Sequence, residues 1–160
     1  MPISTYDLIQ ATTLTSTNSD IVLNTLPTTY ENLILKVTTP TSGGGSAGRT
    51  FLRFNSDSGS NYHHKVLGSS GTSVSTGRES QTYALIGYYG GANSVSIVDI
   101  MGYRSSFHKS SAIRYGNNYP ESAVQVSVWR NTAAITQITV GCLGVFPINT
   151  KVSLYGLVAG

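Results

Sequence analysis

Residues 122–140 and 150–157 alternate apolar and polar side chains with a period of two, and this pattern constrains the fold more than any other feature. Val124, Val126 and Val128 alternate with Gln125 and Ser127. Alternation of this kind places the valines on one face of a β-strand and the polar residues on the other. Similar segments recur along the chain with turn-forming residues between them, so we predict a fold built from strands.

Eleven segments have the composition of strands, and no window of twelve residues has a convincing helical period. Strands at this spacing without helices between them are typical of a sandwich or a barrel. Because several connections are long, we predict an all-β fold, a jelly-roll-like antiparallel β-sandwich with no substantial helix. The expected strands are Asp7–Thr12, Asp20–Asn24, Asn32–Thr38, Thr50–Asn55, Asn61–Leu67, Gln81–Tyr88, Asn93–Met101, Ser110–Tyr115, Ala123–Arg130, Ile135–Val140 and Lys151–Leu157.

The chain has 160 residues, no internal repeat and no linker, which favours a single domain over residues 1–160. Residues 1–6 are too polar to pack alone and are a candidate N-terminal arm that reaches a neighbouring subunit. Two connections, residues 38–48 and 68–77, are uncharged and rich in Gly and Ser. We expect both to be surface loops, either solvated or ordered against neighbouring subunits.

The composition argues against two classes of partner. Charged residues make up 11% of the chain, against about 25% in an average protein. The net charge is +3, and the basic residues are scattered from Lys36 to Lys151. Nucleic-acid binding requires a concentrated basic stripe, so we expect no nucleic-acid partner. The N-terminus lacks a signal-peptide pattern and no segment approaches the ~20 apolar residues of a membrane span, so we expect no membrane association.

Three patterns resemble ligand sites, and none is complete. Residues 43–48 match the glycine pattern of dinucleotide-binding loops, but that motif requires a following helix, and the residues after Gly48 predict a strand. His63 and His64 would point to opposite faces of a strand and cannot easily share one metal ion. Cys142 is the single cysteine and is flanked by apolar residues, as a small buried hydrophobe would be. We therefore predict no cofactor and no metal site.

The segment Asn55–Asn61 places oxygen-bearing side chains at alternate positions, as a calcium loop does. Calcium takes about six to eight oxygen ligands, usually including several carboxylates, and this segment offers only Asp57. The pattern favours a hairpin turn in which Asn and Gly supply positive φ angles. Weak calcium binding stays open as an alternative.

No catalytic constellation is recognisable in the sequence. The seven acidic residues are spread one per region, and no G-x-S-x-G elbow is present. We therefore predict that the chain is not an enzyme.

Aromatic residues concentrate in the middle third of the chain, with two arginines among them. Tyrosine and arginine commonly anchor protein interfaces. Three uses remain open for these rings, namely filling the core, contacting other subunits or a capsid, and binding glycans. The candidate interface residues are Tyr88, Tyr89, Tyr103, Arg104, Tyr115 and Tyr119.

Three segments resemble a family of small virion proteins encoded by tailed bacteriophages, including many that infect cyanobacteria. They read LRFNSDSGSNY (residues 52–62), VWRNTAAIT (128–136) and VSLYG (152–156). Residues 6–14, 26–30 and 33–35 are also similar to that family, so the likeness spans nearly the whole chain in the expected order. Members are structural proteins of the capsid surface or tail fibre without catalytic residues. The resemblance implies a virion protein made in the host cytoplasm.

The most specific expectation is a capsid cement (decoration) protein on the outer capsid that bridges and stabilises major capsid subunits. One compact domain lacks the long stalk of a fibre, which favours the head over the tail. The expected partners are the major capsid protein and the chain itself, with a homotrimer as the natural closed state. Two alternatives are a tail-fibre head or receptor-binding domain that contacts a host glycan, and a free-standing carbohydrate-binding module.

Overall fold

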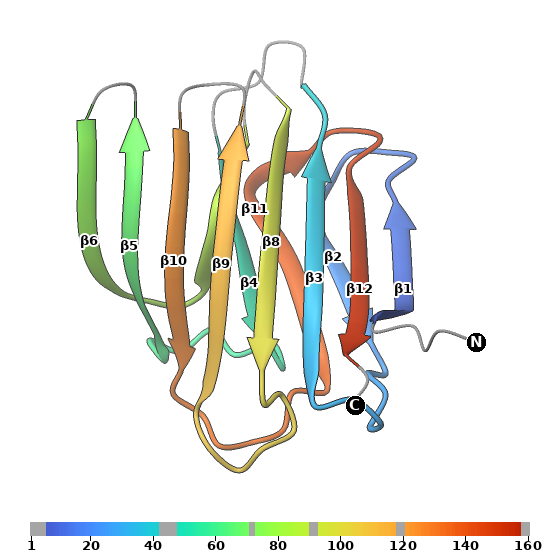
Figure 1. Cartoon of the computed structure of the whole chain (residues 1–160). Coiled ribbons are helices and arrows are strands. Elements are labelled where there is room, and N and C mark those ends of the chain that lie inside the picture. The colour runs from blue at the N-terminus through green and yellow to red at the C-terminus, as the bar shows by residue number, and fades with distance from the viewer. Residues whose placement is uncertain (1–5, 42–47, 71–72, 90–92, 118–120, 158–160) are drawn as a thin grey trace.

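A computed structural model describes residues 6–41, 48–70, 73–89, 93–117 and 121–157. Within these ranges the chain forms twelve strands and no helix, and the strands make two facing sheets (Figure 1). The predicted all-β sandwich is confirmed. The strands are β1 (Tyr6–Thr13), β2 (Asn18–Asn24), β3 (Asn32–Thr39), β4 (Gly48–Phe54), β5 (Tyr62–Ser70), β6 (Ser73–Gln81), β7 (Ala84–Tyr89), β8 (Ser94–Met101), β9 (Lys109–Asn117), β10 (Glu121–Trp129), β11 (Gln137–Phe146) and β12 (Lys151–Leu157).

The two sheets differ in width. The large sheet has eight strands in the order β1-β12-β3-β8-β9-β10-β5-β6, and the small sheet has four in the order β2-β11-β4-β7. The chain crosses repeatedly from one sheet to the other, as between β1 and β2 or β10 and β11, which makes the topology jelly-roll-like. Because the small sheet is half as wide, it covers only part of the inner face of the large sheet, and the hairpin β5–β6 forms one outer edge (Figure 1).

The core lies between the sheets and follows the alternation of the strands. On β3, Leu33, Leu35 and Val37 are buried, whereas Lys36 between them is exposed. At one end of the sandwich the rings of Phe54 and Trp129 pack with their centroids 5.6 Å apart. Apolar residues that recur every second position therefore supply one continuous core, as they do in other sandwiches.

The segments that carry the phage resemblance contact one another. Trp129 Nε1 donates a hydrogen bond to Asp57 Oδ2 (2.7 Å), and the backbone N–H of Arg130 donates to the carbonyl of Asn61 (2.8 Å). Asn55 Nδ2 donates to the carbonyl of Ala134 (2.8 Å). Residues 52–62 and 128–136 thus form one hydrogen-bonded unit at this end of the sandwich, which holds the β4–β5 and β10–β11 loops together.

The third resembling segment is also explained by packing. Gly156 on β12 lies under the ring of Tyr30, and a Cβ atom at this glycine would stand 2.3 Å from the ring. The hydroxyl of Tyr30 donates a hydrogen bond to Asp7 Oδ2 (3.2 Å) on the neighbouring strand β1. The glycine allows Tyr30 to close the edge of the large sheet.

One predicted loop is wrong. Residues 68–77 were expected to be a surface loop, but β5 continues to Ser70 and β6 begins at Ser73. β6 pairs with β5 from Ser73, opposite Ser70, to Gln81, opposite Tyr62. Serine, threonine and valine accept an extended backbone, so pairing with a neighbour decides the conformation where composition does not. The expected strand over residues 81–88 is divided, because Gln81 ends β6 in the large sheet and Ala84 begins β7 in the small sheet.

The other predicted loop is shorter than expected at both ends. Thr38 and Thr39 complete β3, and Gly48 begins β4, while residues 42–47 lie outside the described ranges. A strand therefore follows the glycine pattern of residues 43–48, as predicted, and no helix stands there to hold a pyrophosphate. Of the candidate arm, residues 1–6, only Tyr6 is described, and it begins β1.

Candidate interaction surface

No sheet formed by the described residues covers the outward face of the large sheet (Figure 1), and we call it the open face. The strand register places the outward residues of neighbouring strands side by side. One such row, from β3 to β5, consists of Lys36, Ile97, Arg114, Val124 and Leu67. Residues distant in sequence therefore make one continuous surface.

Strand β10 turns its apolar residues outward onto this face. Val124 and Val126 are 57% and 49% exposed, whereas Gln125 and Ser127 are 1% and 2% exposed. The alternation predicted from the sequence is present. Its orientation is unusual, because the polar side chains of β10 face the core and the apolar ones face solvent, whereas in most half-covered sheets the apolar side faces the core.

The buried polar residues of β10 lie under the edge of the small sheet. Gln125 Nε2 donates a hydrogen bond to the backbone carbonyl of Leu85 on β7, the edge strand of the small sheet. Within the described ranges, Gln125 Oε1 and Ser127 Oγ have no hydrogen-bond partner. A buried polar atom left without a partner costs about 1–3 kcal/mol. The isolated chain thus carries polar groups inside and valines outside on the same strand.

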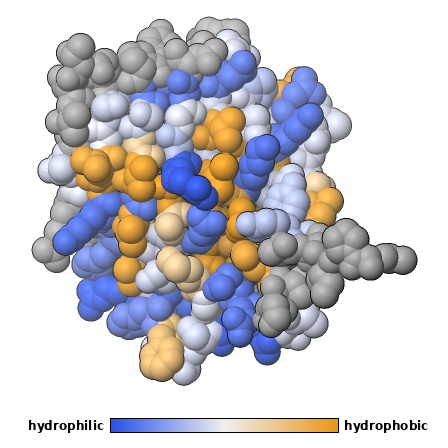
Figure 2. Space-filling model, in the orientation of Figure 1, coloured by the Kyte–Doolittle hydropathy of each residue, from blue (hydrophilic) through white to orange (hydrophobic). Residues whose placement is uncertain are grey.

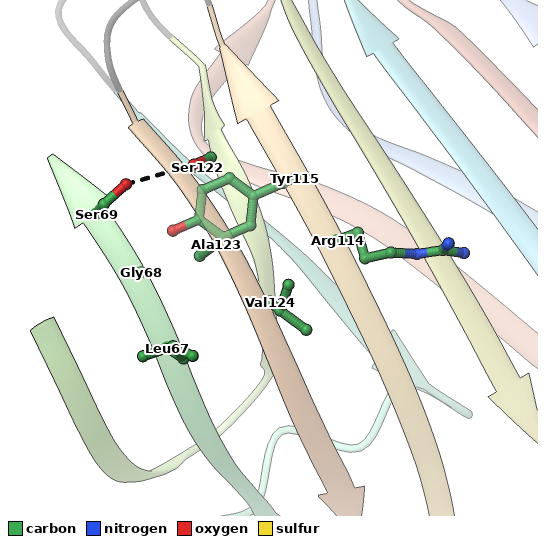
Figure 3. Close-up of a pocket in the computed structure, with 8 residues that line it drawn as sticks. All are labelled: Leu67, Gly68, Ser69, Arg114, Tyr115, Ser122, Ala123 and Val124. Carbon is green, nitrogen blue, oxygen red and sulfur yellow. Dashed lines mark hydrogen bonds between the residues drawn. The ribbon is translucent and has the colours of Figure 1, made fainter. Parts of the chain in front are cut away.

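A shallow hollow of about 500 Å³ lies on the open face between β9, β10 and β5. Figure 3 shows Leu67 and Val124 projecting from neighbouring strands at this place, with the guanidinium of Arg114 extending over β8. Ser69 and Ser122, whose hydroxyls are 3.5 Å apart, lie at its upper end. The side chains in the middle of the hollow are aliphatic.

A second hollow, of about 290 Å³, continues along β10. It is lined by Val126, Val128 and Lys65 together with the histidines at positions 63 and 64. The two hollows follow the same strand, so the groove runs from Ser122 to Val128. Six residues of strand correspond to roughly 20 Å, which is long enough for several side chains of a partner.

The open face is both apolar and positively charged. Among its described strand residues, the basic side chains are Lys36, Lys65, Arg114 and Lys151, and the acidic one is Asp99. Arg114 and Asp99 form an ion pair of 2.9 Å that is 59% and 33% exposed, so it contributes little to stability. Figure 2 shows apolar groups over the middle of this face with hydrophilic groups between them.

The structure does not gather the predicted tyrosines on one surface. Tyr89 and Tyr103 are 6% and 1% exposed and belong to the core. Tyr115 is half-buried on the inner side of the large sheet, where its ring lies 5.9 Å from that of Tyr88, and burial raises the pKa of Tyr115 to about 12. Tyr115 occupies an inward strand position, whereas Tyr103 is buried from the β8–β9 loop. These four rings mainly fill the sandwich and its rim.

The remaining two predicted interface residues differ. Arg104 is exposed in the loop between β8 and β9, and its guanidinium donates a hydrogen bond to the carbonyl of Thr28. Tyr119 lies outside the described ranges.

The loop around Asp57 is a structural turn. Asp57 Oδ1 accepts a hydrogen bond from the backbone N–H of Gly59 (2.8 Å), and Oδ2 accepts from Asn61 Nδ2 (2.9 Å) and Trp129 Nε1 (2.7 Å). Burial would raise the pKa of Asp57, but these hydrogen bonds outweigh it and lower the pKa. The positive φ angles fall at Asn55 (52°), as predicted, and at the following Ser rather than at Gly59. Because both carboxylate oxygens already accept N–H donors, calcium would have to displace them.

The histidines and the cysteine are placed apart. His64 is 3% exposed inside the sandwich, whereas His63 faces outward with Nε2 3.1 Å from Arg130 Nη1. Cys142 is buried, and burial raises the pKa of its thiol to about 11. Within the described ranges, no group of three or more His, Cys, Asp or Glu side chains is placed to hold a metal ion. The described part of the chain also contains no helix long and apolar enough to span a membrane.

Sequence reasoning missed the residues that make the open face. A period of two shows that Val124 and Val126 share a side but not which side the second sheet covers. Phe107, which is 76% exposed in the β8–β9 loop, belongs to the aromatic group of the middle third but is not among the predicted interface residues. Its signal in the sequence is a lone phenylalanine between Ser106 and His108, in a polar turn where a large apolar side chain has no core to enter.

Comparison with known proteins gives no family assignment. No family model and no curated protein matches the chain. Among solved structures, the crystal structure of galectin LEC-6 from Caenorhabditis elegans is similar at a TM-score of 0.37 and 12% identity, over 93% of this chain and 96% of the galectin. A likeness at this level carries no argument about function.

Proposed function

We propose that the chain is a non-enzymatic structural protein of a bacteriophage virion, and most specifically a capsid cement protein that bridges major capsid subunits. The observation that carries the proposal is the open face, where Val124 and Val126 are turned outward around an aliphatic groove. A contiguous exposed apolar surface with a polar rim is typical of a protein-binding site. The sequence resemblance supplies the virion as the place where such a surface works.

The groove fits protein better than neutral sugar. Sugar-binding sites commonly present aromatic faces, and the tyrosines expected to do this are in the core or half-buried at its rim. Valine and leucine side chains bordered by cations match an apolar protein surface that carries carboxylates. The tail-fibre head and the free-standing carbohydrate-binding module are the rival outcomes of the test.

The test is immunogold labelling of purified particles of the phage that encodes the chain, with antibody raised against the folded protein. Particles from a phage deleted for this gene are the control for non-specific label. Gold over the head supports the cement proposal. Gold at the tail tip supports the receptor-binding rival, and particles with no more label than the deletion control would show that the protein acts away from the virion.

A further inference from the structure

The most exposed large apolar side chain in the described ranges is Phe107, at 76%. It lies in the loop between β8 and β9, at the end of the sandwich opposite the upper end of the groove (Figure 1). A phenylalanine in water with no cover is unfavourable, and aromatic anchors of this kind dominate the energetics of many interfaces. The loop therefore presents a candidate contact residue.

The buried side chain of Lys109 holds the backbone of the Phe107 loop in place. Lys109 is fully buried, and its Nζ donates hydrogen bonds to the carbonyl of Phe107 (2.6 Å) and to that of Thr132 (3.3 Å). The backbone N–H of Ser105 donates to the carbonyl of Gly102 (2.9 Å), which tightens the start of the loop. A buried ammonium group is costly unless it is hydrogen-bonded, so Lys109 fixes both carbonyls. The loop thus holds Phe107 in a defined position before any partner arrives, which lowers the entropy cost of binding.

The open face of the same chain has an apolar hollow that can accept such a ring. The hollow around Leu67 and Val124 is shallow and measures about 500 Å³, so it has room for one phenyl ring lying against its aliphatic side chains. Arg114 contributes the aliphatic part of its side chain to the hollow, because its guanidinium extends over β8 to Asp99. The hollow's size and chemistry therefore suit one phenyl group.

Phe107 cannot fill the hollow of its own chain. Arg114 follows Lys109 by five residues on β9, which corresponds to roughly 17 Å of extended strand. The loop also stands at the end of the sheet, whereas the hollow opens on its face (Figure 1). A contact between these two sites must join different copies.

We propose that the occupant of the hollow is Phe107 of a second copy of this chain. The proposal rests on the proposed function in that it takes the open face as a protein-binding surface, and it names the partner. Because the two sites differ, the contact is heterologous and produces a ring or an open chain of copies. One ring buries about 150–250 Å², far below the ~800 Å² per partner of a stable interface, so the contact is weak between free molecules and gains strength when many copies lie on one surface.

The test measures self-association by sedimentation equilibrium over a range of concentrations that extends high enough to populate a weak contact between free molecules. The wild-type protein is expected to associate reversibly. Phe107→Ser and Val124→Lys should each remain monomeric, whereas Phe107→Tyr, which keeps the ring, and Val22→Lys, at an exposed valine of the small sheet, should associate like the wild type. Circular dichroism checks that each variant is folded, as expected for positions that are 76%, 57% and 43% exposed.

A mixture of the two defective variants gives the sharpest result. Phe107→Ser retains its hollow and Val124→Lys retains its ring, so the mixture is expected to form one-to-one dimers and nothing larger. A mixture that stays monomeric, a Phe107→Ser protein that associates like the wild type, or a wild-type protein that is monomeric throughout would overturn the proposal. Gold on the phage head without self-association would support the proposed function and leave the hollow to a different occupant. Self-association without gold on the virion would support the contact through Phe107 and contradict the proposed function.

Discussion

Replacement of Asp57 by alanine is expected to destabilise the fold severely, although the residue lies in a surface turn. The carboxylate accepts hydrogen bonds from Trp129 Nε1 (2.7 Å), Asn61 Nδ2 (2.9 Å) and the backbone N–H of Gly59 (2.8 Å). Trp129 is 1% exposed, so its indole N–H would be left buried without an acceptor. A hydrogen bond to a charged group contributes about 1.5–3 kcal/mol, and an unpaired buried donor costs about 1–3 kcal/mol.

The two free-energy contributions cannot simply be added, because the lost hydrogen bond and the unpaired donor describe the same N–H group. We expect a loss of about 3–5 kcal/mol for Asp57→Ala, which is a large part of the ~5–15 kcal/mol that stabilises a typical domain. Asp57→Asn keeps one carbonyl acceptor and should lose less. Asp20→Asn, at an exposed aspartate on β2, is the control and should change the free energy of unfolding by less than about 0.5 kcal/mol.

The assay is urea unfolding followed by the fluorescence of Trp129, the single tryptophan. The pKa of Asp57 is lowered in the folded state, because its hydrogen bonds outweigh the effect of burial. Its contribution is therefore present above its unfolded pKa, near 4, and is lost as the pH falls through the folded pKa. The gap between wild type and Asp57→Asn should narrow in acid. An Asp57→Ala protein within about 1 kcal/mol of wild type at pH 7 would refute the reasoning, because the hydrogen bonds would then contribute almost nothing net.

Three further predictions test other parts of the structure. Gly156→Val should lower the free energy of unfolding by about 3 kcal/mol, because the added side chain overlaps the ring of Tyr30. Gly77→Val is the control and should be nearly neutral, because no atom lies within 4 Å of the added Cβ. Equal losses of stability in the two variants would contradict this packing. The Cys142 thiol, with a pKa of about 11 and little exposure, should not react with Ellman's reagent in the native protein at pH 8 and should react after unfolding in urea. Self-association should strengthen as salt screens the repulsion between Arg104 in the Phe107 loop and the basic residues of the open face, and weakening with salt would contradict a contact between these two sites.

The period of two predicted the strands well because it reports which residues share a face. The predicted strand Asn32–Thr38 places Leu33, Leu35 and Val37 on one side, and the structure buries them together. The same rule could not decide the sense of β10, because that depends on how far the small sheet extends over the large one. The hairpin partner of β5 was missed for a related reason, since the pairing that makes residues 73–81 a strand involves a contact and not a composition.

The described tyrosines of the predicted interface do not share one surface, because tyrosine suits two environments. A ring with one polar atom can anchor an interface, but it can also fill a sandwich and bond outward through its hydroxyl, as Tyr89 does to the carbonyl of Val145 (2.9 Å). Burial therefore decides the role, and the sequence does not report it. Arg104 is exposed, as expected for a guanidinium, which seldom enters a core without a partner.

The reversed strand β10 connects the fold to the proposed function. In the isolated chain, exchanging Gln125 and Ser127 with their valine neighbours would bury apolar area and expose polar atoms, which lowers the free energy by the usual rule. The observed arrangement instead uses Gln125 to satisfy a carbonyl on β7 and leaves Val124 and Val126 at the surface. Exposure of these valines to water is unfavourable, whereas their burial against a second protein surface would lower the free energy. Under the proposed function, binding of a second protein to the open face would recover the free energy that the lone chain forgoes there.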